Sequence, residues 1–195
     1  MGKEKYLKDI ENIFKKSAVV DAKSIERFIK SKKRIKQYQK QLIRNLILKG
    51  KIKRLTKGYY SLYDDPSLLV FCFKPAYLGL QDAMSFNNLW EQETIPVIIT
   101  SKKIRQGIRK VFGNNVLIRR IKKRYIFGFE YQKQKDYYLP YSNIEKTFID
   151  MIYFNQKISE EDLKNILKQV NKQKLKSYLK IYPLKFRKNI LNFIS

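Results

Sequence analysis

The chain of 195 residues contains no histidine, one cysteine and only seven scattered glycines. Without them it lacks the ligands of a finger-type zinc site, an internal disulfide bond, a histidine general base and a glycine-rich phosphate loop. The single Cys72 lies in an apolar run, where we expect the thiol to pack as a small core side chain. These absences remove most common catalytic schemes, and the sequence therefore predicts a protein that is not an enzyme and needs no metal or cofactor.

Long hydrophobic runs are also missing. The longest one, residues 68–73, is far too short to cross a membrane, and the first residues are polar and charged without the apolar core of a signal peptide. We therefore expect a cytoplasmic protein. A hydrophobic share of 44% with 14 Tyr and 12 Phe is ample for folded cores, so we expect one or two globular domains.

Acidic residues are scarce, and the scarcity is local. The chain has 43 Lys and Arg against 17 Asp and Glu, a formal net charge of +26, and residues 27–63 carry no acidic residue at all. A codon bias toward lysine explains abundant Lys but not a long stretch without Asp or Glu. Because each neutralised phosphate releases condensed counterions, such a stretch is typical of a surface that binds a polyanion.

The acid-free stretch belongs to a pattern of three helices and a hairpin. Apolar spacing predicts helices over residues 4–16, 21–29 and 31–49. Asp21 is the expected cap at the start of the second helix, and Gly50 the expected cap at the end of the third. Residues 51–63 follow as two strands joined by a turn. This order is typical of a winged helix-turn-helix, which binds DNA.

The third predicted helix has one apolar stripe and an opposite polar face. Glutamine can contact adenine with two hydrogen bonds, and Lys or Arg can contact guanine or phosphates, so the polar face and the basic hairpin fit a DNA interface. An ordinary solvated helix face is the alternative. The predicted DNA-binding residues are Lys32, Lys33, Arg34, Lys36, Gln37, Lys40, Gln41, Arg44, Lys51, Lys53, Arg54 and Lys57.

Asp64, Asp65 and Pro66 interrupt both the charge and the pattern, so we predict two domains, residues 1–63 and 67–195. The second domain has an α+β pattern that ends in helices. The predicted strands cover residues 68–73, 95–100, 116–121 and 124–131, and the first predicted helices cover 80–90 and 103–112. Further helices are expected after the caps Asn143 and Ser159, with a break at Pro183.

The second domain has its own acid-free stretch, residues 94–129. It fits a second nucleic-acid surface, a docking surface for an acidic partner protein, or a plain solvated face, and the sequence does not separate these. The candidate residues are Lys102, Lys103, Arg105, Arg109, Arg119, Arg120, Lys122 and Lys123.

Three segments resemble the AbiEi antitoxin family of winged-helix regulators. Residues 42–62 resemble its helix, glycine, strand and Gly-x-Tyr wing; residues 75–84 resemble a helix of small residues; and residues 144–150, Ile-Glu-Lys-Thr-Phe-Ile-Asp, resemble its Glu-Arg-Thr-Leu-Leu-Asp signature. The resemblance covers most of the chain. It implies a fold with a winged helix-turn-helix followed by an α+β antitoxin domain.

The resemblance also implies two activities. The winged helix would repress the protein's own operon by binding inverted repeats in double-stranded DNA, and the second domain would counteract a nucleotidyltransferase-like toxin in a type IV, phage-defence system. In such a system the antitoxin and the toxin need not form a stable complex.

Two other functional classes remain open to sequence reasoning. A nuclease or nucleotidyltransferase needs clustered carboxylates for Mg²⁺, and we expect Glu145 and Asp150 to serve in capping and ion pairing instead. An RNA- or ribosome-associated module without antitoxin activity would suit the positive charge as well as a DNA-binding regulator does.

Overall fold

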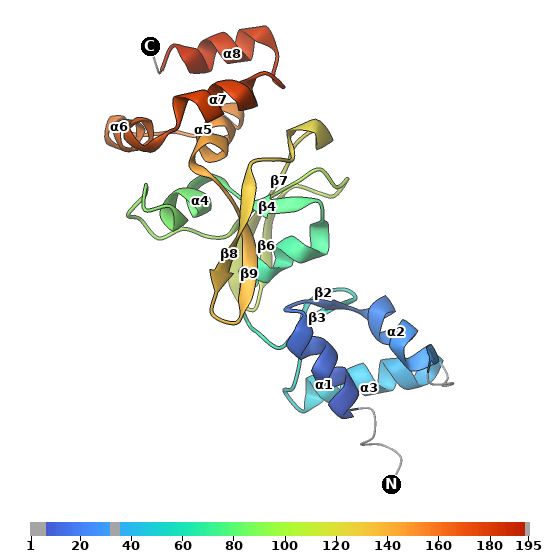
Figure 1. The fold of residues 1–195 in the computed structure, drawn as a ribbon. Helices are drawn as coiled ribbons and strands as arrows, with labels where there is room; N and C mark the ends of the chain where they lie inside the picture. Colours follow the sequence, from blue (N-terminus) through green and yellow to red (C-terminus); the bar gives the residue numbers. More distant parts are fainter. Residues whose placement is uncertain (1–6, 32–35, 194–195) are drawn as a thin grey trace. The chain divides into compact units, whose positions relative to one another are not determined.

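The computed structural model describes residues 7–31 and 36–193 (Figure 1). The described residues form two compact units of a mixed α+β protein. Unit 1 covers the chain up to Cys72 together with Val111–Asn114, and unit 2 covers Phe73–Lys110 and residues from Asn115 onward. The expectation that residues 1–63 and 67–195 fold separately, with a boundary at residues 64–67, stays a prediction.

Unit 1 combines three helices with a small antiparallel sheet. Its elements are α1 (Leu7–Lys16), β1 (Val20–Asp21), α2 (Ala22–Ser31), α3 (Lys36–Leu48), β2 (Lys53–Thr56) and β3 (Tyr59–Ser61). The strand order is β1-β3-β2, so the predicted hairpin gains a third strand. Strand β1 was not predicted, because two residues are too few to show an alternating pattern.

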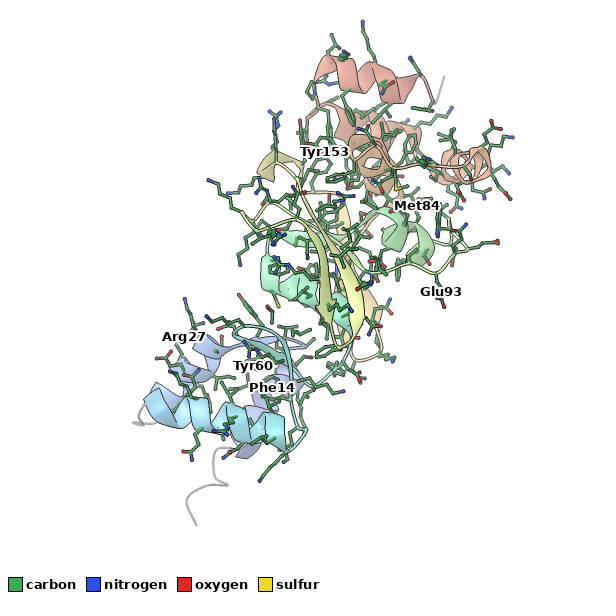
Figure 2. All side chains as sticks on the ribbon, turned by 180° about the vertical axis from the view of Figure 1, so that it is seen from behind. Phe14, Arg27, Tyr60, Met84, Glu93 and Tyr153 are labelled. Carbon is green, nitrogen blue, oxygen red and sulfur yellow. The ribbon has the colours of Figure 1, made fainter. Side chains whose placement is uncertain are left out.

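Local caps shape these elements as expected. Asp21 Oδ1 accepts a hydrogen bond of 2.8 Å from the Ser24 backbone N–H at the start of α2. Gly50 has a φ of +67°, the left-handed conformation of a C-terminal cap after α3. The helices and the hairpin enclose a core that includes Ile10, Phe14 and Leu46; Figure 2 labels Phe14 and the partly buried Tyr60 of this core.

The predicted strand over residues 68–73 is wrong. This run belongs to a 3₁₀ helix, η1 (Pro66–Phe73), in which Leu68, Leu69 and Cys72 are buried. A short, continuous apolar run has no period, so its sequence does not distinguish a buried strand from a buried helical turn. Cys72 is buried among apolar side chains, as expected.

Unit 2 is built on a six-stranded mixed sheet with the order β6-β7-β5-β4-β9-β8. Its strands are β4 (Ala76–Leu78), β5 (Val97–Thr100), β6 (Gly107–Val111), β7 (Asn114–Arg120), β8 (Phe129–Gln134) and β9 (Tyr137–Ser142). Strands β5 and β7 are parallel neighbours, as are β4 and β9, whereas β4 with β5 and β8 with β9 are antiparallel.

The predicted helix over residues 103–112 is also wrong, because half of it is strand β6 and none of it is helical. Phe112 and Gly113, with φ of 51° and 82°, form a tight two-residue connection between β6 and β7. Pairing with a neighbouring strand overrides the weak helical spacing of this segment. Strands β4 and β9 were not predicted. The predicted strand over 124–131 overlaps the end of η2 (Lys123–Tyr125) and the start of β8.

Helices complete unit 2. They are α4 (Leu80–Phe86), α5 (Ile144–Tyr153), α6 (Glu160–Gln169), α7 (Lys172–Leu179) and α8 (Leu184–Leu191). The Asn143 side chain accepts from the Lys146 N–H and the Ser159 side chain from the Asp162 N–H, so both predicted caps are confirmed, and Pro183 precedes α8 as expected. Met84 and Tyr153, labelled in Figure 2, lie in the core of unit 2. No helix among the described residues is long and apolar enough to cross a membrane.

Candidate nucleic-acid interface

Helix α3 presents a polar face because its apolar side chains are used inside unit 1. Leu42, Ile43 and Leu46 are buried on one side of the helix. Lys40, Gln41 and Arg44 are exposed, as the helical wheel predicted. The same helix therefore contributes to the core and presents groups that can contact bases and phosphates.

The four predicted DNA-binding cations of the hairpin differ in whether a carboxylate pairs with them. Arg54 and Lys57 are exposed. Lys51 Nζ pairs with Glu11 at 2.5 Å, and Lys53 Nζ pairs with Asp64 at 2.7 Å. All four were predicted to be available for DNA binding, because the sequence does not show that carboxylates from other segments lie beside two of them. Arg54 and Lys57 are therefore the hairpin cations whose charge no acidic partner offsets among the described ion pairs.

A groove of about 520 Å³ brings α3 and the hairpin together with α2. Four of the predicted DNA-binding residues line it: Lys40 and Arg44 from α3, and Arg54 and Lys57 from the hairpin. The groove also has an apolar side that the sequence analysis did not anticipate, and its members are Ile43, Ile47, Leu48 and Tyr60. Leu48 at the end of α3 is 74% exposed. The signal in the sequence was the run Leu46-Ile47-Leu48, because three consecutive residues of a helix cannot all face the core.

The groove is positioned by a contact between α2 and α3. The Gln39 side chain is buried and donates a hydrogen bond from Nε2 to the carbonyl oxygen of Ala22. Lys23 and Glu26 of α2 complete the lining, and Glu26 is its single acidic residue. The positive charge of the lining favours an anionic ligand.

The remaining predicted DNA-binding residues lie outside this description. Lys32, Lys33 and Arg34 are outside the described residues, and the structure gives the backbone but not the side chains of Lys36 and Gln37.

The predicted basic segment of unit 2 does not form one continuous element. Arg109 lies on β6, where its guanidinium stacks 5.0 Å from the centre of the Phe73 ring, and Lys102 Nζ lies 6.0 Å from the same ring. Arg119 and Arg120 are the last residues of β7, and Lys122 and Lys123 follow them. Lys103 and Arg105 are exposed in the connection between β5 and β6.

A fully buried polar cluster occupies the centre of unit 2. Lys146 Nζ donates hydrogen bonds to Asp150 Oδ1 and, at 3.2 Å, to the Tyr182 hydroxyl; Tyr77 Oη donates to Asp150 Oδ2 at 2.6 Å. Burial lowers the pKa of Lys146 and raises the pKa of Asp150, while the charge of each partner opposes the other's shift. Burial also raises the pKa of Tyr77 and of Tyr182 well above the usual tyrosine value, with the Asp150 carboxylate as the second cause.

The two carboxylates of the signature segment therefore have the predicted roles of ion pairing and capping. Asp150 pairs with Lys146, as described above. Glu145 Oε1 accepts from the Asn171 backbone N–H at 2.9 Å, just before α7, and Glu145 Oε2 lies 3.4 Å from Lys174 Nζ. Among the described residues, no group of three or more Cys, Asp or Glu is arranged to hold a metal ion.

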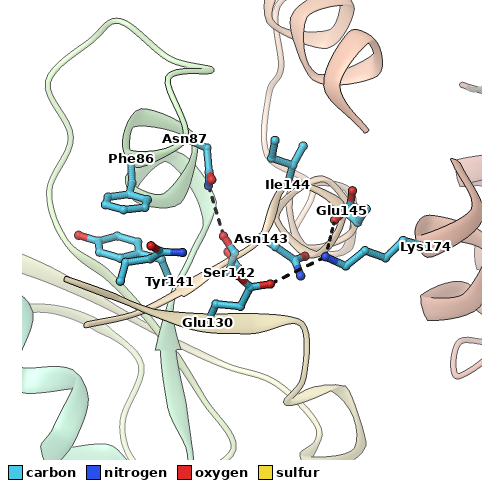
Figure 3. Close-up of a pocket in the computed structure, with 10 residues that line it drawn as sticks. Phe86, Asn87, Glu130, Tyr141, Ser142, Asn143, Ile144, Glu145 and Lys174 are labelled. Carbon is cyan, nitrogen blue, oxygen red and sulfur yellow. Dashed lines mark hydrogen bonds and ion pairs between the residues drawn. The ribbon is translucent and has the colours of Figure 1, made fainter. Parts of the chain in front are cut away.

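A pocket of about 260 Å³ in unit 2 lies beside Glu145 (Figure 3). Lys174 lies between Glu145 and Glu130, at 3.4 and 3.9 Å, and Asn87 donates to the carbonyl oxygen of Ser142 at 3.3 Å. The rings of Phe86 and Tyr141 stack with their centres 4.2 Å apart. These polar and aromatic contacts join α4, β9, β8, α5 and α7, so they explain how the pocket is held.

No protein-family model matches the chain, and no match was found among curated proteins.

Proposed function

We propose that the protein is a DNA-binding transcriptional regulator whose first unit is a winged helix-turn-helix. The observation that carries the proposal is the groove of unit 1, which collects Lys40, Arg44, Arg54 and Lys57 from α3 and the hairpin. In a winged helix, the third helix enters the major groove and the hairpin contacts the backbone beside it. The element order of unit 1, with strand order β1-β3-β2, supports this assignment.

In this proposal, neutralisation of phosphates supplies most of the binding free energy, and Gln41 supplies part of the sequence specificity. Each phosphate neutralised by a cation contributes about −0.9 to the slope of log K against log salt concentration on duplex DNA. Gln41 is exposed on α3, and a bidentate contact to adenine contributes roughly 1–3 kcal/mol of discrimination.

The test is a fluorescence-anisotropy titration of duplexes from the region upstream of the protein's own coding sequence. Removing the groove cations in K40A/R44A/R54A/K57A should weaken binding to every duplex and reduce the salt slope by about 3 to 4. Q41A should instead bring the affinities for different duplexes closer together by roughly 1–3 kcal/mol.

The matched control is K15A/K16A, which removes two exposed cations at the end of α1, away from the groove lining. It should change affinity far less per charge than K40A/R44A does. Equal losses per charge would sink the proposal, and so would tighter binding to RNA than to any duplex, which would favour the RNA- or ribosome-associated module.

We further propose that unit 2 is the antitoxin part, acting against a nucleotidyltransferase-like toxin, and that the protein works in phage defence. The support is the resemblance of residues 75–84 and 144–150 to the AbiEi family. In the structure these residues contribute Tyr77, Lys146 and Asp150 to the buried cluster of unit 2, so the matching segments form the centre of that unit.

Co-expression with a cognate nucleotidyltransferase-like toxin tests this division. The full chain carrying K40A/R44A/R54A/K57A should lose repression of its operon and keep rescue of the cells. Loss of rescue in this variant, at unchanged protein level, would contradict a separate antitoxin activity of unit 2.

A further inference from the structure

The basic residues of unit 2 gather at one edge of its sheet. Strand β5 ends at Thr100 and strand β7 at Arg120; the two strands are parallel, and Thr100 lies opposite Arg120. The segments that follow both strands therefore leave the sheet at the same edge. These segments, with Arg120 itself, carry seven exposed cations, here called the carboxyl-edge cations: Lys102, Lys103, Arg105, Arg120, Lys122, Lys123 and Arg124.

Hydrogen bonds hold the two segments together. The Arg120 backbone N–H donates to Gln106 Oε1 at 2.8 Å, and the Ile121 N–H donates to the carbonyl oxygen of Thr100 at 2.9 Å. Thr100 Oγ1 also accepts from the Lys102 N–H at 3.0 Å. Because these hydrogen bonds fix the backbone of both segments, the segments lose less conformational entropy when a ligand binds.

Six of these seven charges, all but that of Lys102, have no carboxylate partner among the described residues. In contrast, Lys51, Lys53, Lys146 and Lys174 all have acidic partners. Like charges collected without counter-charge repel one another, and a bound polyanion removes that repulsion.

One arginine beside the edge has an unfilled donor. Arg119 is partly buried on β7, next to Arg120, and its Nε has no hydrogen-bond partner among the described residues. Neighbouring side chains on a strand point to opposite faces of the sheet, so this buried Nε does not lie on the Arg120 side. Arg119 is therefore not counted among the carboxyl-edge cations.

The apolar side chains that lie between these cations in the sequence are buried in unit 2, although Ile108 at the start of β6 is 64% exposed. Ile121 and Tyr125 are buried, and the Arg124 guanidinium stacks 4.9 Å from the Tyr125 ring. Protein interfaces usually place apolar and aromatic anchors at their centre. This edge offers cations around a buried apolar layer, which suits a phosphate backbone better than the surface of a protein.

We propose that the carboxyl-edge cations bind the phosphate backbone of a nucleic acid without reading its sequence. Phosphate contacts position a protein on nucleic acid, while base contacts specify the sequence. Unit 2 would thus hold nucleic acid through a site of its own. The proposal does not depend on DNA binding by unit 1.

The experiment compares two alanine triplets in the full chain. R120A/K122A/K123A removes three carboxyl-edge cations, and K164A/K168A/K176A removes three exposed lysines from α6 and α7. Both triplets lower the net charge by three. Each is made in the wild-type chain and in a chain that also carries K40A/R44A/R54A/K57A, so that binding by unit 1 is measured separately.

Binding of fluorescein-labelled 20-nucleotide polyuridylate RNA and of a random 20-base-pair duplex is measured by anisotropy across a salt series. The edge triplet should lower the affinity for both probes by roughly tenfold more than the control triplet. It should also reduce the salt slope for the single strand by about 2, since each phosphate contact contributes about 0.7. The effect should persist in the unit 1 variant.

Three results would overturn the proposal. Equal losses of affinity for both triplets would mean that binding responds only to bulk charge. Displacement of the RNA by polyglutamate as effectively as by unlabelled RNA would indicate an acidic protein partner, and displacement by millimolar inorganic phosphate at constant ionic strength would indicate a small-anion site. If circular dichroism shows R120A/K122A/K123A to be unfolded, K102A/K103A/R105A tests the other segment. If the edge triplet lowers the affinity but K40A/R44A/R54A/K57A does not, the DNA-binding regulator proposed for unit 1 is refuted, whereas the proposal for unit 2 stands.

Discussion

At the residue scale, the most unusual group is Lys146, whose side chain is fully buried beside Asp150. Its ammonium group lies 5.4 and 5.1 Å from the ring centres of Tyr77 and Phe127. A buried ion pair stabilises only when hydrogen bonds satisfy its other donors and acceptors. Here the hydroxyls of Tyr77 and Tyr182 do so. Tyr77 needs its proton to donate to Asp150, and burial near the Asp150 carboxylate keeps Tyr182 neutral while it accepts from Lys146.

The tyrosines make unit 2 sensitive to alkaline pH. Because the folded-state pKa of Tyr182 is raised, its stabilising contribution is complete below the unfolded tyrosine pKa of about 10 and is lost as the pH rises further. Where the folded state keeps a proton that the unfolded state has lost, the free energy of unfolding falls by about 1.4 kcal/mol for each pH unit of increase. Between pH 10.5 and 11.5, wild-type protein should therefore lose about that much more stability than Y182F.

Urea unfolding at both pH values measures this difference. Y138F is the control, because Tyr138 is 55% exposed on β9. Its pH dependence should match that of the wild type. An identical pH dependence for Y182F would show that the Tyr182 hydroxyl does not keep its proton in the fold.

At the element scale, Gly128 determines how β8 begins beside α5. It has a φ of +70°, its carbonyl oxygen accepts from the Asn143 N–H at 2.9 Å, and a Cβ built on it would lie 2.9 Å from Lys146 Cβ and from Tyr178 Cε2. Both the backbone conformation and the packing therefore require glycine here.

G128A and G113A separate these two requirements. Gly113 has a similar φ of +82°, but a Cβ there would meet nothing within 4 Å. G113A should cost about 1 kcal/mol of unfolding free energy from the left-handed backbone alone. G128A should cost about 1–3 kcal/mol more, because the added methyl group overpacks the contact with Lys146 and Tyr178. Equal losses in chemical denaturation would mean that the neighbours of Gly128 move away freely.

At the scale of the whole molecule, the described residues include one hydrophobic cluster in unit 1 and another in unit 2, with separate members. Phe14 is 1% exposed in the core of unit 1, and Phe148 is fully buried in the core of unit 2. Since each core is assembled from its own helices and strands, the two units should unfold as separate cooperative transitions.

Two large-to-small substitutions test this independence in the full chain. F14A and F148A should each remove about 3–5 kcal/mol from one unit. In calorimetry, F14A should lower the midpoint of one transition and F148A that of the other. A single transition that both substitutions shift alike would mean that the units fold as one, and it would remove the predicted boundary at residues 64–67.

The sequence by itself determined the features that depend on neighbouring residues. The caps Asp21, Asn143 and Ser159 act within three residues of their own position, and Gly50 ends a helix through its own φ, so local pattern sufficed. The polar face of α3 followed from helical periodicity in the same way.

Tertiary structure decided what depends on residues distant in the sequence. The segments at 68–73 and 103–112 were predicted wrongly because burial and strand pairing, rather than local spacing, set their conformation. Carboxylates from other segments neutralise Lys51 and Lys53, and the parallel pairing of β5 with β7 collects cations about twenty residues apart at one edge. Charge composition is readable from the sequence because it is a sum over residues. Which charges face solvent together is not, because that depends on strand order.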